Sequence, residues 1–313
     1  MNPPTTVQPE AAFDSQPQAP ANLAATRPMY WSVRRELWEN RSIYIAPLIV
    51  TGFVLFGSLI SMFGLPRKMQ TLPAHDPAQQ HVLVVKPFSM APAPIMLATF
   101  LVGIFYSLDA LYGERRERSI LFWKSMPVSD RTTVLSKASI PLVVLPLVAF
   151  VLSVATFVAL LLVSTAVLLA NGVSPVTLWA EVRFVQEPLV MLYGLTVHAL
   201  WFAPIYGWLL LVSVWARRTP VLWAALPWVA ISVVERVAFD SSHFAALLRY
   251  RVIGAMARAF TVDPQRADVG IIDRVSQLTP ARFLGTPGLW IGLVVAAACL
   301  AGAMRLRRIR EPI

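Results

Sequence analysis

The sequence predicts an all-α, polytopic membrane protein, and three observations support this class. Hydrophobic residues make up 57% of the chain and charged residues only 14%, and the mean hydropathy is +0.61. A soluble domain carries about 25% charged residues. Several uncharged runs reach or approach the ~20 residues that an α-helix needs to cross a bilayer, and the basic residues gather between these runs.

Six membrane spans are predicted, at about 44–65, 92–112, 140–170, 189–215, 220–238 and 289–304. The third span is long for a ~30 Å hydrocarbon core, so it must tilt or project beyond the bilayer. Pro141 and Pro146 predict a kink near its start. No internal repeat is visible, so residues 29–313 are expected to form one helical domain.

The distribution of arginine and lysine predicts that both termini lie in the cytoplasm. With the N-terminus inside, 16 of the 27 basic residues flank the cytoplasmic ends of the spans. The outer loops after spans one and three then hold only Arg67, Lys68, Lys86 and Arg183. This asymmetry follows the positive-inside rule, and it makes residues 239–287 an extracytoplasmic loop.

Two segments are predicted before the first span. Residues 1–28 are rich in Pro, Ala, Gln and Thr and have no apolar centre, which excludes a cleaved signal peptide and favours a disordered cytoplasmic tail. A helix over 29–41 places Trp31 and Trp38 on a broad apolar arc, with Glu36 on the opposite side. We expect an amphipathic helix in the membrane interface, and the alternative is a plain extension of the first span.

The sequence lacks the common motifs of ATP binding and hydrolysis. It contains no G-x-x-x-x-G-K-[ST], no H-E-x-x-H and no G-x-S-x-G, so we expect no phosphate cradle and no such catalytic site on this chain. The four histidines, His75, His81, His198 and His243, are scattered, which argues against a metal site. A single cysteine, Cys299, excludes an intramolecular disulfide. The net charge of +10 fits arginine-rich loops better than nucleic-acid binding.

Three polar residues in the spans are candidates for a functional role, because ionisable groups are costly in a bilayer. Asp109 lies near the inner end of span two, and the alternative to a functional role is an ion pair with Arg115 or Arg116. His198 lies within span four, where a hydrogen-bonded packing residue is the commoner role. Glu235 lies near the outer end of span five. A proton relay would need a chain of carboxylates, which the sequence lacks.

The connector between spans two and three, residues 113–139, is the segment best suited to bind a partner. Residues 113–125 favour a helix that Pro127 ends, and Ser129 or Asp130 is suited to cap a second helix. Large apolar and basic residues lie together here, a combination typical of protein interfaces. The predicted interface consists of Glu114, Arg115, Arg118, Phe122, Trp123, Met126, Pro127, Val128 and Ser129. The alternative is a charged loop that only sets the topology.

The connector resembles a motif of ABC-2 type transporter permeases. The run ERRERSIL at 114–121, followed by MPVS at 126–129 and by Lys137, is similar to the family pattern E-R-x-x-G-T-L … P-V-S-R … K. The chain departs from that pattern at Ser119 and Ile120, where many members carry Gly-Thr, and at Asp130, where many carry a basic residue. The basic run at 305–312 is also similar to the tail of such permeases.

This resemblance implies the membrane-spanning subunit of an ATP-driven exporter in the bacterial cytoplasmic (inner) membrane. Two permeases would pair as a homodimer or heterodimer. Each would be served by an ATP-binding cassette subunit on a separate chain, which would hold ATP and Mg²⁺. This chain would be no enzyme and would need no cofactor.

The resemblance also assigns positions to three segments. The connector would be the coupling helix, 30–40 would be the interfacial helix, and 239–287 would hold a re-entrant hairpin in which the weakly amphipathic stretch 244–260 dips into the outer leaflet. The alternatives are a proton-driven secondary transporter and a membrane-embedded enzyme. The first would need a carboxylate relay, and the second a catalytic cluster within the spans.

Overall fold

The computed structural model describes residues 27–72, 76–117, 129–261 and 272–309. In these ranges the chain is helical and forms no β-strand, and an isolated antiparallel bridge joins Phe260 to Leu278. The predicted all-α class is therefore confirmed for the described residues.

The helices follow one another with short connections. In chain order they are α1 (Pro28–Glu39), α2 (Ser42–Met62), α3 (Leu65–Thr71), α4 (Pro77–Met90), α5 (Pro92–Asp109), α6 (Tyr112–Arg116), α8 (Asp130–Ser139), η3 (Ile140–Val144), α9 (Leu145–Ala170), α10 (Val176–Glu181), α11 (Gln186–Trp215), α12 (Pro220–Phe239), α13 (His243–Ala259), η4 (Val275–Gln277), α14 (Pro280–Leu284) and α15 (Pro287–Ile309). A proline occupies the first position of α5, α12 and α15, where its missing N–H would have no partner within the helix.

Six helical stretches among the described residues are long and apolar enough to cross a membrane, as predicted. They are Ser42–Met62, Gln79–Arg116, Asp130–Ala170, Gln186–Trp215, Pro220–Phe239 and Pro287–Ile309. The second and third stretches run for 38 and 41 residues, far beyond the ~20 that a bilayer requires. The additional residues belong to α4 and α6, which flank α5, and to α8, which precedes α9. The loop predicted between spans one and two is therefore largely helical.

Pro141 disturbs the helix near the start of span three, as predicted. Residues Ile140–Val144 form a π-helical turn between α8 and α9. Proline has no N–H for the regular backbone ladder, so it favours such a local break.

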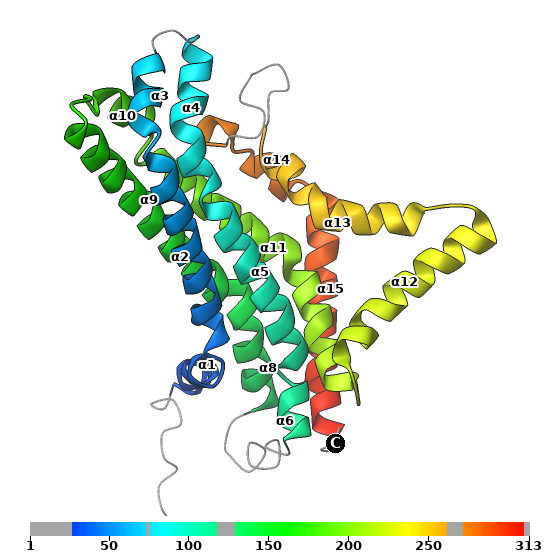
Figure 1. Ribbon diagram of the computed structural model, residues 1–313. Coiled ribbons are helices and arrows are strands. Elements are labelled where there is room, and N and C mark those ends of the chain that lie inside the picture. Colours follow the sequence, from blue (N-terminus) through cyan, green and yellow to red (C-terminus); the bar gives the residue numbers. More distant parts are fainter. Residues whose placement is uncertain (1–26, 73–75, 118–128, 262–271, 310–313) are drawn as a thin grey trace, which may run out of the picture.

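Helix α11 is the centre of the bundle and α12 lies at its edge (Figure 1). In the most apolar 18-residue stretch of each helix, 61% of the stretch is buried in α11 but only 6% in α12. Gly207 lets α11 approach α15 closely, because a Cβ at this position would lie 3.2 Å from the carbonyl oxygen of Ala296. Helix α12 leans away from the bundle, and α13 returns toward α11 and α15 (Figure 1). The weakly amphipathic stretch 244–260 is thus helical over nearly its whole length, as α13.

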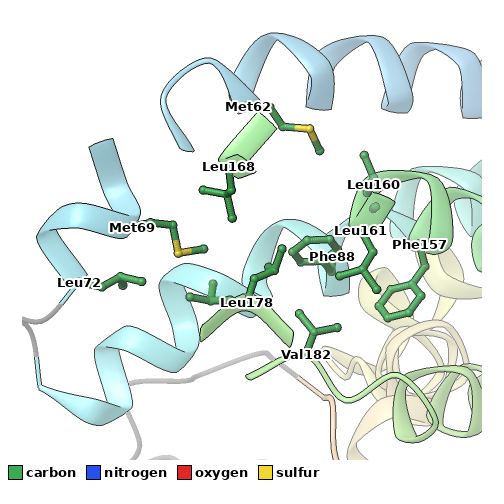
Figure 2. Close-up of a cluster of buried hydrophobic side chains, with 12 residues drawn as sticks. Met62, Met69, Leu72, Phe88, Phe157, Leu160, Leu161, Leu168, Leu178 and Val182 are labelled. Carbon is green, nitrogen blue, oxygen red and sulfur yellow. The ribbon is translucent and has the colours of Figure 1, made fainter. Parts of the chain in front are cut away.

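One end of the bundle is filled by apolar side chains from α2, α3, α4, α9 and α10 (Figure 2). We call this cluster the apolar cap; its buried members are Met62, Met69, Leu72, Val84, Phe88, Ala91, Phe157, Leu160, Leu161, Leu168, Leu178 and Val182. The rings of Phe88 and Phe157 meet edge to face with centroids 6.1 Å apart. The cap joins the projecting helices α3, α4 and α10 to the long helix α9.

The first helix is separate from the first span. The chain leaves helical geometry at Asn40, with φ −109° and ψ 72°, and α1 runs across the end of the bundle (Figure 1). The alternative of a plain extension of α2 is therefore wrong. The side chains of Tyr30, Trp31 and Trp38 are all more than half exposed, while Glu36, on the opposite side of the helix, is buried.

Candidate functional site

The connector is described on both sides of its centre, from α6 to Glu117 and again from Ser129. The predicted interface residues Arg118, Phe122, Trp123, Met126, Pro127 and Val128 lie outside the described residues. Glu114, Arg115 and Ser129 are described, and they occupy different environments.

Glu114 and Arg115 do not present their side chains to a partner in this structure. They are 8% and 4% exposed, so the protein itself covers both side chains. The reason is long-range pairing: complementary groups on α1, α8, α11 and α15 meet these side chains at the base of the connector.

Glu114 forms ion pairs with basic side chains from three other helices. Its Oε1 atom lies 3.1 Å from Nζ of Lys137 and 3.2 Å from Nη2 of Arg35, and its Oε2 atom lies 3.1 Å from Nη2 of Arg307. Lys137 is on α8, Arg35 on α1 and Arg307 on α15. A single carboxylate therefore connects the connector to the first and last helices of the bundle.

Glu36 is the second centre of the same network. Its Oε1 atom lies 2.8 Å from Nζ of Lys137, and its Oε2 atom accepts a hydrogen bond of 2.7 Å from the hydroxyl of Tyr106 on α5. Glu36 is 1% exposed and Lys137 is 2% exposed. Lys137 therefore bridges two buried carboxylates.

Asp130 completes the network at its edge. Its Oδ1 atom lies 3.6 Å from Nη1 of Arg307. We call the six charged groups the ion cluster: Arg35, Glu36, Glu114, Asp130, Lys137 and Arg307. Three carboxylates face three cations in it, which matters because an unpaired buried charge is far more costly than a paired one.

Arg115 fastens the connector to α11. Its Nη1 atom donates to the carbonyl oxygens of Val214 and Ala216, at the C-terminal end of that helix. These carbonyls have no partner within the helix and carry the negative end of its dipole, so a guanidinium is well matched to them. The hydroxyl oxygen of Ser213 accepts from the backbone N–H of Leu111 and of Tyr112, at 3.0 and 2.8 Å. The start of α6 is thus held on α11 by two kinds of contact.

Ser129 caps α8, as predicted. Its hydroxyl oxygen accepts a hydrogen bond of 3.1 Å from the backbone N–H of Thr132. The first turn of α8 also contains Asp130, where a carboxylate is favoured by the helix dipole. The second half of the connector therefore begins at a defined residue.

Asp109 is not part of the ion cluster. It is exposed at the end of α5, and among the described residues no ion pair joins it to Arg115 or Arg116, which was the alternative to a functional role. Arg115 points to the end of α11, and Arg116 lies 3.3 Å from Glu117.

His198 and Glu235 lie on α11 and α12, away from the cluster. The Nε2 atom of His198 is 3.2 Å from the hydroxyl of Tyr206, and its ring packs on Phe202 with centroids 4.7 Å apart. Glu235 accepts from the backbone N–H of His243 at 2.7 Å and of Phe244 at 2.8 Å. These are the contacts of a packing histidine and of a cap on α13. No hydrogen bond or ion pair joins Asp109, His198 and Glu235 to one another within the described ranges.

The sequence indicated the membrane flanks that supply the ion cluster but not the pairing. Lys137 appeared only as the last residue of the connector motif, and Arg307 only within the basic run at 305–312. The available signal was that each arginine-rich flank involved contains a carboxylate: Glu36 in the first, and Glu114 and Asp130 in the second. The partners of Glu36 and Glu114 lie on other helices, as far as 193 residues away, so spacing within one helix could not reveal them.

The arrangement couples the connector to several helices. Within the described ranges, no group of three or more His, Cys, Asp or Glu residues is arranged to hold a metal ion. The ion cluster and Arg115 instead tie the connector to α1, α8, α11 and α15. A displacement of α6 would therefore strain contacts on all four.

Comparisons of the chain with protein-family models, with curated proteins and with solved structures found no match.

Proposed function

We propose that this chain is the membrane-spanning permease subunit of an ATP-binding cassette exporter, in which a separate subunit binds and hydrolyses ATP. The observation that carries the proposal is the connector. Its sequence is similar to the ABC-2 motif, and its base is fastened to four helices by buried charged groups. A segment that binds a moving partner needs such an attachment to pass the movement on.

In this proposal both termini and the ion cluster face the bacterial cytoplasm. The described chain begins and ends at the same end of the bundle, next to the connector (Figure 1), and the exposed tryptophans of α1 would lie in the inner membrane interface. The apolar cap and α13 would then lie on the extracytoplasmic side.

The proposed mechanism is mechanical. When ATP closes the two partner subunits, they displace the connector. Glu114 carries α15 and α1 with it through Arg307 and Arg35, while Arg115 carries the end of α11. Because charged hydrogen bonds are directional and weaken steeply with misalignment, these helices move together with the connector. A second permease, identical or related, would complete the transport path.

The first test is for the partner. The tagged chain is purified from native membranes in mild detergent, and co-purifying proteins are identified by mass spectrometry. We expect an ATPase that contains a P-loop, and we expect ATP hydrolysis only when it is present. Hydrolysis by the rigorously pure single chain, or the consistent absence of any ATPase, would contradict the proposal.

The second test is for the connector. The double substitution Phe122→Ala and Trp123→Ala removes two large apolar side chains near its centre, and removal of such an anchor typically costs about 2 kcal/mol of binding. We expect normal membrane insertion with at least about tenfold weaker binding of the ATPase. The matched control is Trp179→Ala, which removes an exposed tryptophan on α10 at the opposite end of the bundle. Equal binding by both variants would refute the connector as the docking site.

A further inference from the structure

A buried histidine joins three distant segments at the end of the bundle opposite the ion cluster. His81 on α4 is 7% exposed. Its Nδ1 atom lies 2.8 Å from Oε2 of Glu181 on α10, and its Nε2 atom lies 2.8 Å from Oδ2 of Asp273, just before η4. The three residues are separated by 100 and 192 positions in the sequence, so the imidazole ring is a cross-link between α4, α10 and the segment that leads into α14.

With both carboxyl groups ionised, this geometry requires the protonated ring. A neutral imidazole has one N–H donor and one lone pair, whereas the imidazolium has two donors. Carboxylates accept hydrogen bonds and donate none when ionised. With a carboxylate at hydrogen-bond distance from each ring nitrogen, only the imidazolium makes both contacts, and the neutral ring would turn a lone pair toward one of the two carboxylates.

The surrounding charges favour a cation at the same place. Glu187 on α11 interacts electrostatically with both His81 and Asp273, and it also accepts a hydrogen bond of 2.7 Å from the hydroxyl of Ser89. Asp273 also has two arginines at a greater distance: Nε of Arg274 lies 3.8 Å from its Oδ1, and Nε of Arg183 lies 3.9 Å from its Oδ2. Three carboxylates thus face two guanidinium groups, so that a protonated ring would supply a third positive charge.

We propose that His81 is a pH-sensitive latch. When the ring is protonated, it links α4 to both α10 and the segment 272–277. When the ring loses its proton, it can donate to only one carboxylate, so one link opens. Histidine changes charge in the range of about pH 5 to 8, and the protonated form is the closed one. The latch therefore closes as the pH falls and loosens as the pH rises.

Closure of this latch governs how α13 and α14 are attached. Segment 272–277 precedes α14, and its Gln277 carbonyl accepts from the backbone N–H of Thr261, just after α13. Release of Asp273 from His81 removes a tether between α4 and this part of the chain. The latch does not depend on the transporter assignment, because it follows from the ring and its two carboxylates alone.

The test is hydrogen–deuterium exchange of the full chain in lipid nanodiscs at about pH 5.5 and about pH 8, with rates corrected for intrinsic exchange. We expect amides in at least one of the two segments 176–182 and 272–277 to exchange about tenfold faster or more at the higher pH, the effect of losing one hydrogen bond between charged groups. His81→Gln should abolish this pH dependence and exchange fast at both values.

Two further variants keep the test decisive. The control His243→Gln changes a histidine whose side chain is 91% exposed, and it should behave as the wild type does. If His81→Gln fails to fold, Asp273→Asn takes its place, since an amide removes one of the two charges that require the imidazolium. Equal corrected rates at both pH values in the wild type, or a pH dependence that survives in the folded variant, would overturn the proposal.

Discussion

The two ends of the bundle are held together by different chemistry. At the connector end, α1, α6, α8 and α15 meet through the ion cluster, whose pairs lie between 2.8 and 3.6 Å. At the other end, α3, α4, α9 and α10 meet through the apolar cap, and His81 lies beyond it as a polar cross-link.

This difference means that the helices are attached rigidly at the connector end and packed more adaptably at the end with the apolar cap. Charged hydrogen bonds fix both distance and direction, whereas apolar burial is non-directional and depends on the area and volume filled. The connector end is therefore suited to pass on a displacement, and the cap end is suited to repack when its helices shift. Four substitutions test this comparison.

Removal of Glu114 should have the largest effect. Glu114→Ala leaves Lys137, Arg35 and Arg307 without a shared carboxylate, and breaking a buried pair in this way costs about 3–5 kcal/mol. The measurement is the free energy of unfolding in detergent. Glu117→Ala is the control, because the side chain of Glu117 is 67% exposed, and a change below about 0.5 kcal/mol is expected for it. Equal stability of the two variants would show that the ion cluster does not hold the connector end.

A cavity in the apolar cap should cost less. Leu168 is 0% exposed, and Leu168→Ala should lower the free energy of unfolding by about 2–3 kcal/mol through lost contacts and the cavity left behind. The neighbouring Leu169 is 60% exposed, so Leu169→Ala is the matched control with little expected change. A loss as large for Leu169 as for Leu168 would argue that lipid contact, rather than the cap, determines stability at this end.

A substitution at Gly292 on α15 tests how Arg251 is held, since this cation contacts a ring and a backbone carbonyl rather than a carboxylate. Arg251 on α13 lies over the ring of Trp201, 4.7 Å from its centroid, and donates to the carbonyl of Gly288 at 3.0 Å. A Cβ on Gly292 would lie 1.9 Å from the Nη2 atom of Arg251. Gly292→Ala must therefore displace the guanidinium of Arg251.

We expect Gly292→Ala to cost about 2 kcal/mol, as overpacking of a filled site does, and to increase hydrogen exchange in α13. Gly57→Ala is the control, because a Cβ at Gly57 meets nothing within 4 Å. Unchanged exchange in α13 of the Gly292 variant would mean that Arg251 does not anchor that helix.

Loss of the cap on α8 should have the smallest effect. Ser129→Ala removes the acceptor for the N–H of Thr132 and should cost about 1 kcal/mol. Ser129→Asp retains an acceptor at the same position and should restore most of the loss. If alanine and aspartate are equally stable, the hydroxyl contributes nothing to the start of α8.

The spans could be predicted from the sequence because the bilayer imposes their length and composition directly. Runs such as 140–170 have no other stable environment, and Pro141 perturbs its helix through a covalent property of the residue itself. The capping by Ser129 was also predictable, since a cap acts within three residues. These features depend on local chemistry, which the sequence displays.

The ion cluster could not be predicted in the same way. A helical wheel assigns Glu36 to the polar side of α1, and the simplest expectation places that side in water. The side faces the bundle instead, because Lys137 and Tyr106, which lie 101 and 70 residues further along, complete its hydrogen bonds. Burial of Glu114 likewise depends on Arg307. Such contacts are set by how the helices pack, and a single sequence carries no direct record of that packing.

The position of Arg307 on the last helix has a consequence for biosynthesis. Glu114 is made 193 residues before Arg307, so during translation this carboxylate enters the membrane interface without one of its cations. The connector end can reach its final arrangement only after α15 has been inserted. A chain interrupted before α15 would leave Glu114 on α6 and Asp130 on α8 without Arg307.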